Sequence, residues 1–423
     1  MKQFLPRRTV IASALAAVSL SLMAGAAQAR CDKLSNPKAG EINIIGNVFP
    51  ALQHIAKEME TCTQSGLKVQ FKMTPNLRPE VEQAFAVSGP VAFEAAVVPS
   101  GVFSGLNAKG QLQPMTDLVA KYRTKYKIEE NMLVKVNGEV MAIAFMSNAQ
   151  NLYYRKDLFD KHGIKVPTTY PEMLVAAKTL MDKEPTIQYP LAQTFAKGFD
   201  SGAEFVNLFV GAGGKFFKAG SAQPDFNSDA GVKALETMIA MTKLMTPNFL
   251  ASNTDDVMNQ FQQGRAGVGV LWASRANRMD DEKASKVVGK MEFAAAPAMM
   301  PGGKSATHLW WDGVVMPKNM KGDRETTFQV LMEALDEETM RKGNDLTNWL
   351  RSAYKPTRFG TGVAASAKAG APVWPTEPFF GLANGEINKV IPDILTGAMT
   401  PRAGLDAAAL AYAKVAKEQG FIK

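Results

Sequence analysis

Polar side chains with hydrogen-bonding capacity follow a short apolar run at residues 140–146, which is predicted to be a buried strand. Ser147, Asn148 and Gln150 come directly after this run, and Tyr153 lies beside them in a second apolar segment. Amide groups both donate and accept hydrogen bonds, so this set suits a ligand covered in hydroxyl groups. The alternative is a connection between two structural units whose polar side chains only cap the backbone.

A pair of Trp residues next to an acidic residue is the second candidate site. Trp310 and Trp311 directly precede Asp312 and Gly313. Neighbouring side chains of a strand point to opposite faces, so at most one of the two rings should face a cleft. An aromatic ring stacks on the apolar face of a sugar, and Asp312 offers two strong acceptors to hydroxyls at its edge. The alternative places one Trp in the core and uses Asp312 to cap a turn.

A third cluster ends a glycine-containing strand predicted over residues 266–271. Trp272, Ser274 and Arg275 follow that strand. A Trp is rarely fully buried and its N–H needs a partner, which allows either a cleft or a core position for Trp272. If the ligand were anionic, Arg275 and Arg351 would form charge-assisted hydrogen bonds to it.

The elements that must position these residues begin with an alternation of strands and helices. The expected order is strand 41–46, helix 49–60, strand 67–73, helix 81–86 and strand 93–98. Such alternation predicts an α/β lobe with a mostly parallel sheet, whose ligands meet the carboxyl ends of the strands. Asn47 and Phe49 after the first strand and Asn76 after the second are therefore candidates. The alternative is that these loops are only turns.

Residues 1–29 have the features of a secretory signal peptide rather than of a folded element. A basic start is followed by an uncharged apolar segment at 10–27, and the stretch 27–29 fits the small-x-small cleavage pattern. Arg7 and Arg8 allow a twin-arginine route, although general secretion fits the sequence better. Removal of this segment deletes three basic residues and lowers the formal net charge from +8 to +5.

The remaining chain is long enough for two or three domains. Its mild positive charge is compatible with a neutral or an anionic ligand. No dense run of Lys and Arg with interleaved aromatic residues occurs, so nucleic acid is not an expected partner. No later stretch is long and apolar enough to span a membrane.

Cys31 and Cys62 are the two cysteines of the chain. In an exported protein an isolated pair suggests one disulfide, with two free thiols as the alternative. The bond would tie the mature N-terminus to the end of the first helix and contribute ~2–4 kcal/mol. His54, His162 and His308 lie far apart without metal-ligand spacing, so we expect no metal. No cofactor is expected either.

The stretch 138–159 resembles the crossing segment of the family 1 extracellular solute-binding proteins, the periplasmic sugar-binding subunits of bacterial ABC importers. The matching residues are Gly138, Asn148, Gln150, Leu152, Tyr153, Tyr154, Lys156, Asp157, Leu158 and Phe159. Met141 and Phe145 stand at or near the usual Tyr and Pro of that pattern, and Ala149 replaces its Thr, which removes one possible hydroxyl contact.

Further matches follow in the family's order along nearly all of the mature chain. Glu94 stands where the family has an Asp-containing motif, and Trp272 ends a stretch similar to Phe-x-x-Gly-x-Ala-x-Met-x-x-Gly-x-Trp. The resemblance implies a cleft position for Trp272. It also implies that Arg351 and Tyr354 belong to a loop that borders the ligand. The ending 399–406 is similar to the family's Met-Thr-Pro-x-x-Ala-Leu-Asp.

This resemblance implies a periplasmic-binding-protein type of α/β fold, in which two lobes are joined by a hinge and enclose the ligand between them. We expect lobe one to comprise residues 41–146 and 291–335, and lobe two to comprise 147–290 and 336–423. The lobes would close on the ligand, and the closed form would dock on a membrane permease. We expect a monomer in the periplasm.

The leading hypothesis is therefore a binding protein that delivers a carbohydrate to an ABC transporter. Trp272, Tyr153 and one of the two adjacent Trp residues would stack on the ligand. Its hydroxyls would bond to Asn148, Gln150 and Asp312. The alternatives are the same transport role with an anionic or modified sugar or a non-sugar solute, and a secreted glycosidase with paired carboxylates, which no local motif supports.

Overall fold

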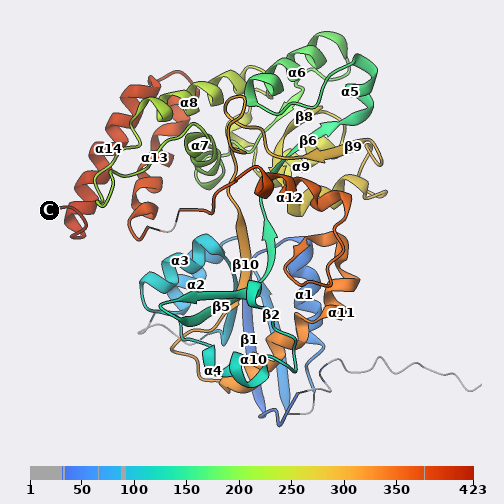
Figure 1. Ribbon diagram of the computed structural model, residues 1–423, viewed down its shortest axis with the longest axis vertical. Helices are drawn as coiled ribbons and strands as arrows, with labels where there is room; N and C mark the ends of the chain where they lie inside the picture. The colour runs from blue at the N-terminus through green and yellow to red at the C-terminus, as the bar shows by residue number, and fades with distance from the viewer. Residues whose placement is uncertain (1–30, 32–33, 65, 87–91, 376) are drawn as a thin grey trace, which may run out of the picture.

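The computed structural model describes residues 31, 34–64, 66–86, 92–375 and 377–423, which form two α/β lobes around separate sheets (Figure 1). The predicted signal peptide, residues 1–29, lies outside the described residues. Within the described part of the chain, no helix is long and apolar enough to cross a membrane.

The sheet of lobe one has the strand order β11-β5-β10-β3-β1-β2, with β4 paired to β5. Its strands are β1 (Gly40–Gly46), β2 (Leu67–Met73), β3 (Ala95–Pro99), β4 (Leu133–Val136), β5 (Glu139–Asn148), β10 (Trp310–Val315) and β11 (Asn348–Trp349). The first three are parallel, as the strand–helix alternation predicts, whereas β10 runs antiparallel to both β3 and β5.

Short helices cover this sheet: α1 (Pro50–Glu60), α2 (Leu77–Ala84), α3 (Ser100–Ala108), α4 (Thr116–Tyr122), α10 (Arg324–Ala334) and α11 (Glu337–Lys342). The helix predicted over 81–86 begins earlier, at Leu77. Leu77, Val81 and Ala84 are its buried residues, so one apolar stripe runs its whole length.

The sheet of lobe two has the order β7-β8-β6-β9, made of β6 (Gln150–Arg155), β7 (Leu191–Ala192), β8 (Val268–Trp272) and β9 (Met291–Ala294). Its helices are α5 (Lys156–His162), α6 (Tyr170–Lys183), α7 (Phe199–Gly211), α8 (Asp229–Thr242), α9 (Thr254–Gln262), α12 (Thr361–Lys368), α13 (Phe380–Leu395) and α14 (Pro401–Glu418). Figure 1 shows α8, α13 and α14 gathered on one side of this lobe.

Three connections join the lobes. β5 ends at Asn148 and β6 begins at Gln150, so a single residue separates strands of different sheets. β9 leads to β10, and β11 leads to α12. Asn148 and Trp310 are partners in the β5–β10 register, which places both at the junction of the lobes.

Two parts of the expected lobe division are wrong. β9 pairs with β6 and therefore belongs to lobe two, although residues 291–335 were expected in lobe one. Conversely, α11 packs on α1 and β11 pairs with β5, so residues 337–349 belong to lobe one rather than lobe two. The physical reason is strand pairing: the chain changes sheet after β9 and again after β11. The other boundaries stay predictions.

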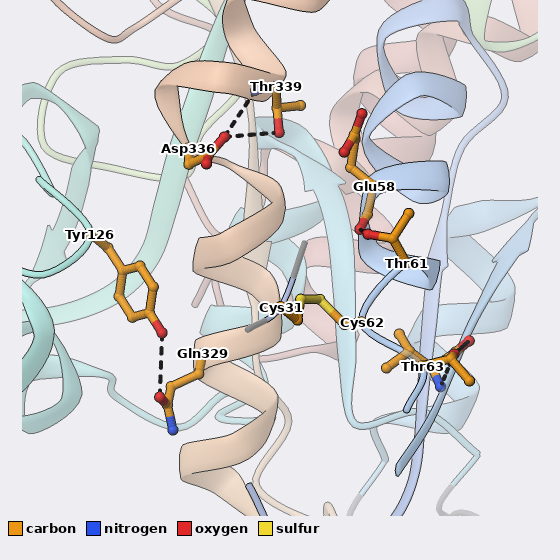
Figure 2. The surroundings of a disulfide bond; sticks show 10 residues. Cys31, Glu58, Thr61, Cys62, Thr63, Tyr126, Gln329, Asp336 and Thr339 are labelled. Carbon is orange, nitrogen blue, oxygen red and sulfur yellow. Dashed lines mark hydrogen bonds between the residues drawn. A yellow bond between two sulfur atoms is a disulfide. The ribbon is translucent and has the colours of Figure 1, made fainter. Parts of the chain in front are cut away.

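A helix cap and the predicted disulfide are two local features of the structure, and the disulfide prediction is confirmed. Thr169 and Glu172 form a capping box at the start of α6. Cys31 and Cys62 form the disulfide, with their Cα atoms 4.9 Å apart. Figure 2 shows this bond beside α10, near the Tyr126–Gln329 hydrogen bond. The two cysteines are 31 positions apart in the sequence, and their link fastens the C-terminal end of α1.

Candidate functional site

A cavity of about 620 Å³ lies between the lobes. Lobe one contributes the loop after β1, with Asn47 and Phe49, and the ends of β3, β5 and β10. Lobe two contributes the first turns of α7 and α9 and the end of β8. The carboxyl ends of parallel strands meet at this edge of the lobe-one sheet, where ligands of α/β proteins usually bind.

Aromatic rings form one wall of the cavity. The rings of Trp272 and Trp310 are 5.7 Å apart between centroids and nearly perpendicular. Phe199 stands edge-on to Trp310 at 6.1 Å, and half of its surface is exposed. The wall therefore combines rings of both lobes, because Trp310 belongs to β10 and the other two belong to lobe two; Trp310 is largely buried, and Phe199 and Trp272 are more exposed.

Trp310 and Asp312 share one face of β10, since they are two residues apart in a strand. Trp311 points the other way and packs on Phe103 at 5.2 Å. The structure thus identifies Trp310 as the ring at the cavity. Gly313 does not line the cavity. A Cβ there would lie 2.8 Å from the Ile143 carbonyl oxygen, so the glycine allows β10 to pack closely on β5.

Asn148 ties the ends of β5 and β8 together. Its Oδ1 accepts hydrogen bonds from the Ser274 N–H at 3.3 Å and the Ala149 N–H at 3.0 Å. Its Nδ2 donates to the Ser274 hydroxyl at 3.3 Å, and Arg275 Nη1 donates to the same hydroxyl at 3.2 Å. Asn148 and Ser274 both line the cavity, and their hydrogen bonds also hold Arg275 in place.

The charged groups at the cavity are mostly carboxylates. Asp312 is 6% exposed, and among the described residues no hydrogen bond reaches its carboxylate. Burial raises the pKa of Asp312 to about 7, against the influence of the Arg275 guanidinium. Burial also raises the pKa of Asp200 to about 6, and Asp255 and Asp256 add to that shift.

Arg275 is the guanidinium that lines this cavity. Its Nε lies 3.8 Å from Asp255 Oδ1, and burial lowers the pKa of Arg275. With Asp200 and Asp312 also lining the cavity, carboxylates outnumber the guanidinium there. This balance favours hydrogen-bond donors over anions as ligand groups.

Tyr153 and Gln150 were predicted to contact the ligand. Neither lines the cavity, so this prediction is wrong for both residues. Tyr153 is fully buried between Phe261 and Phe293, and its hydroxyl donates to the Trp272 carbonyl oxygen at 2.7 Å. Gln150 is also buried, and its amide donates to the Glu204 carboxylate at 2.7 Å. Both belong to β6, which lies between β8 and β9.

Four other candidates also lie elsewhere. Glu94 precedes β3, at the end of the sheet away from the cavity, and accepts a hydrogen bond from the Asn43 N–H at 2.8 Å. Arg351 donates to the carbonyl oxygens of Leu335, Lys127 and Tyr126. The hydroxyl of Tyr354 donates to Asn348 Oδ1 at 3.2 Å. Asn76 directly precedes α2 and does not line the cavity. Its neighbour Pro75 does.

The sequence interpretation missed Phe199, Asp200 and Asp255. They lie in the first turns of α7 and α9, outside the polar clusters that the sequence analysis selected as candidate sites. The capping box of Asn253 and Asp256 was a readable sign that α9 starts there. No sign in the sequence places that helix start at the cavity.

Comparison with known proteins identifies close parallels. Residues 49–321 match the family model described as bacterial extracellular solute-binding protein. A mannitol-binding protein of Pseudomonas aeruginosa is 26% identical over 220 residues, which cover 51% of this chain and 50% of that protein. A probable amino-acid ABC transporter periplasmic-binding protein of Sinorhizobium fredii is 23% identical over 176 residues, 40% of each chain. The chain thus spans about half the length, or less, of these curated relatives.

Solved structures share the fold over most of the chain. A ribitol complex of an ABC transporter solute-binding protein from Agrobacterium radiobacter has a TM-score of 0.78 at 21% identity, and covers 90% of this chain and 100% of its own. A D-mannitol complex from Agrobacterium vitis has a TM-score of 0.75 at 19% identity, with coverage of 90% and 100%. The predicted architecture of two α/β lobes is therefore confirmed.

Proposed function

This chain belongs to the bacterial extracellular solute-binding protein family, and we propose that it captures a carbohydrate between its lobes and delivers it to an ABC transporter permease. In this proposal the protein acts as a periplasmic monomer without catalytic activity. The segment 1–29 would serve as the cleaved export signal.

The observation that carries the proposal is that the Trp wall lies beside the Asp312 carboxylate, which accepts no hydrogen bond from the described residues. Trp310 and Asp312 share one strand face, and Trp272 meets Trp310 from the other lobe. A sugar or polyol has apolar C–H faces that stack on rings and hydroxyls that donate to a carboxylate. One ligand could therefore use both features and contact both lobes.

The charges of the cavity support a neutral ligand. Arg275 already lies beside Asp255 and the Ser274 hydroxyl. Arg351, the second cation considered for an anionic sugar, is buried in lobe one against carbonyl oxygens. The names of the compared proteins mention mannitol and ribitol, which are uncharged polyols. We therefore place neutral polyols and sugars ahead of anionic sugars.

Closure of the lobes would follow from contacts on both sides of the cavity. A ligand that touches Asp312 from lobe one and Trp272 from lobe two stabilises the conformation in which both are near it. The three connections between the lobes supply the hinge. A glycosidase would instead consume its ligand, so recovery of unchanged carbohydrate after incubation distinguishes the two functions.

A thermal-shift screen of ligand-free protein tests the proposal. The panel contains ribitol, D-mannitol, maltose, a sugar acid and amino acids. A ligand that binds only the folded state adds roughly 2.7 kcal/mol at a hundredfold excess over its dissociation constant. We expect a rise in melting temperature with a neutral carbohydrate. A rise with amino acids alone would overturn the carbohydrate assignment.

A further inference from the structure

A buried carboxylate that does not itself line the cavity lies on α7, the helix whose first turn does line it. Glu204, on α7, is fully buried. Its oxygens accept hydrogen bonds from Gln193 Nε2 at 2.6 Å, Gln150 Nε2 at 2.7 Å and the Thr194 hydroxyl. Burial raises the pKa of Glu204 to about 7, while these three hydrogen-bonding partners favour the ionised form, whose two oxygens only accept hydrogen bonds.

This hydrogen-bond network reaches the first connection between the lobes. Gln150 is the residue with which β6 begins, two positions after the end of β5. Its side chain binds Glu204, and its backbone N–H donates to the Thr307 hydroxyl at 3.2 Å. Both the side chain and the backbone of this residue are therefore held at the point where the chain enters lobe two.

The same network reaches the second connection. Asn207, one turn after Glu204 on α7, donates through its amide to Gln150 Oε1. Its Oδ1 lies 2.7 Å from His308 Nδ1. Burial lowers the pKa of His308 to about 3, so the ring is neutral. Because the Asn207 oxygen can only accept, Nδ1 is the ring nitrogen that carries the proton in this contact. His308 stands two residues before β10.

The network also supports the wall of the cavity. The His308 ring meets Trp374 at 5.3 Å, and Trp374 lies 4.4 Å from Trp310. Helix α7 itself begins with Phe199 and Asp200, which line the cavity. A shift of α7 relative to the two connections would therefore displace rings and a carboxylate at the ligand site.

We propose that Glu204 is a positioning residue that fastens Gln150, in the first lobe connection, to α7. Through Gln150 it also holds the Asn207 amide that binds His308 in the second connection, and so it fixes the hinge geometry and the aromatic wall. A buried carboxylate without a cation is unfavourable by itself, and such groups are retained in some proteins because they specify one arrangement. The consequence for ligand affinity rests on the proposed function, whereas the consequence for hinge geometry does not.

The test compares Glu204→Gln with Thr194→Val and Gln329→Leu. Glu204→Gln replaces one acceptor oxygen by a donor facing other donors, and Thr194→Val removes a single donor of similar shape. Gln329 is a buried amide in lobe one and serves as the matched control. It accepts hydrogen bonds from the Tyr126 hydroxyl (Figure 2) and from the Ser35 N–H.

The main readout needs no ligand. Spin labels at Lys68→Cys and Lys178→Cys, both exposed and on different lobes, report the distance distribution between the lobes. We expect Glu204→Gln to shift or broaden this distribution, Thr194→Val to do so less, and Gln329→Leu to leave it unchanged. D-mannitol or maltose, whichever binds the unmodified protein, should bind Glu204→Gln at least tenfold more weakly.

Two outcomes overturn the inference. One is a folded Glu204→Gln protein, or a folded Thr194→Val protein should the first not fold, with an unchanged lobe-to-lobe distance distribution. The other is an equal change of that distribution in Gln329→Leu, which would reveal a general loss of stability. If no carbohydrate of the thermal-shift panel binds the unmodified protein, the proposed function fails, and the distance measurement still decides the role of Glu204.

Discussion

The guanidinium carbon of Arg275 lies 5.9 Å from the centre of the Phe49 ring, and the two side chains come from opposite lobes. Phe49 precedes α1 of lobe one, and Arg275 follows β8 of lobe two. A cation above an aromatic face is attracted to it by about 0.5–1 kcal/mol when exposed and by more when desolvated. This contact bridges the cavity and gives the two lobes a direct link beside the proposed ligand.

Trp272→Ala should weaken carbohydrate binding at least tenfold without unfolding the protein. Trp272 is only partly buried, so its loss removes ring surface from the cavity more than from the core. A tenfold change corresponds to about 1.4 kcal/mol, within the range of a single stacking ring. Calorimetric titration and circular dichroism measure affinity and folding.

Trp311→Phe is the matched control for that experiment. Trp311 lies on the opposite face of β10 and packs on Phe103. Its substitution should lower stability slightly and leave affinity unchanged. Equal losses of affinity in the two variants would contradict the assignment of the wall to Trp272 and Trp310.

Carbohydrate binding should strengthen as pH rises from 5 to 8. Burial raises the pKa of Asp312 to about 7 and that of Asp200 to about 6, so both carboxyls are largely protonated at pH 5. Hydroxyl donors of a ligand stabilise the ionised form, so binding competes with protonation. In Asp312→Asn the rise above pH 6 should disappear, and a pH-independent affinity of the unmodified protein would contradict this account.

The same carboxyl makes a prediction about folding stability. The pKa of Asp312 is higher in the folded protein than its ordinary value of 3.8, so the folded state binds more protons between those two pH values. Its contribution to stability is therefore present at low pH and is lost as pH rises through about 7. Thermal unfolding of ligand-free protein and Asp312→Asn across this range measures the difference.

Binding of a neutral carbohydrate should change little with salt. Only ligands with a net charge lose Coulomb attraction as ions screen the cavity. Dissociation constants measured at 20 mM and at 500 mM sodium chloride should therefore differ by less than about twofold for an uncharged ligand. A steep loss of affinity at high salt would instead indicate an anionic ligand held by Arg275.

Replacing both disulfide cysteines by Ser should lower stability by about 2–4 kcal/mol and leave affinity unchanged. The bond fastens the C-terminal end of α1, whereas the cavity lies at its N-terminal end. The 11 residues of this helix separate the two ends by about 16 Å. Denaturant unfolding and titration with the same carbohydrate test both parts, and a matching loss of affinity would contradict this separation.

Much of the fold follows from local sequence patterns. The strand–helix alternation of the first hundred residues predicted the parallel strands. Because successive side chains of a strand point to opposite faces, the sequence also predicted that only one of Trp310 and Trp311 faces the cavity. The position of Tyr153 could not be read in the same way. Tyr153 is buried because its strand, β6, pairs with β8 on one side and with β9 on the other. Both partner strands lie over a hundred residues away in the sequence.

The residues that sequence analysis missed share a cause. Asp200 and Phe199 stand at the start of α7, and only the packing of lobe two against lobe one brings that helix end to the cavity. Arg351 was misplaced for the complementary reason. Its charge suggested a contact with an anionic ligand. Its guanidinium instead donates hydrogen bonds to three backbone carbonyl oxygens, one just after α10 and two in the loop before β4.

Calorimetric titration of ligand-free protein with D-mannitol, ribitol and maltose tests the central claim most directly, with Asp312→Ala and Gln329→Leu measured alongside. The account predicts binding of one molecule per chain for at least one of these carbohydrates. That binding should be lost or at least tenfold weaker in Asp312→Ala and kept in Gln329→Leu. Undiminished binding in a folded Asp312→Ala protein, or no binding of any carbohydrate by the folded unmodified protein, would contradict it.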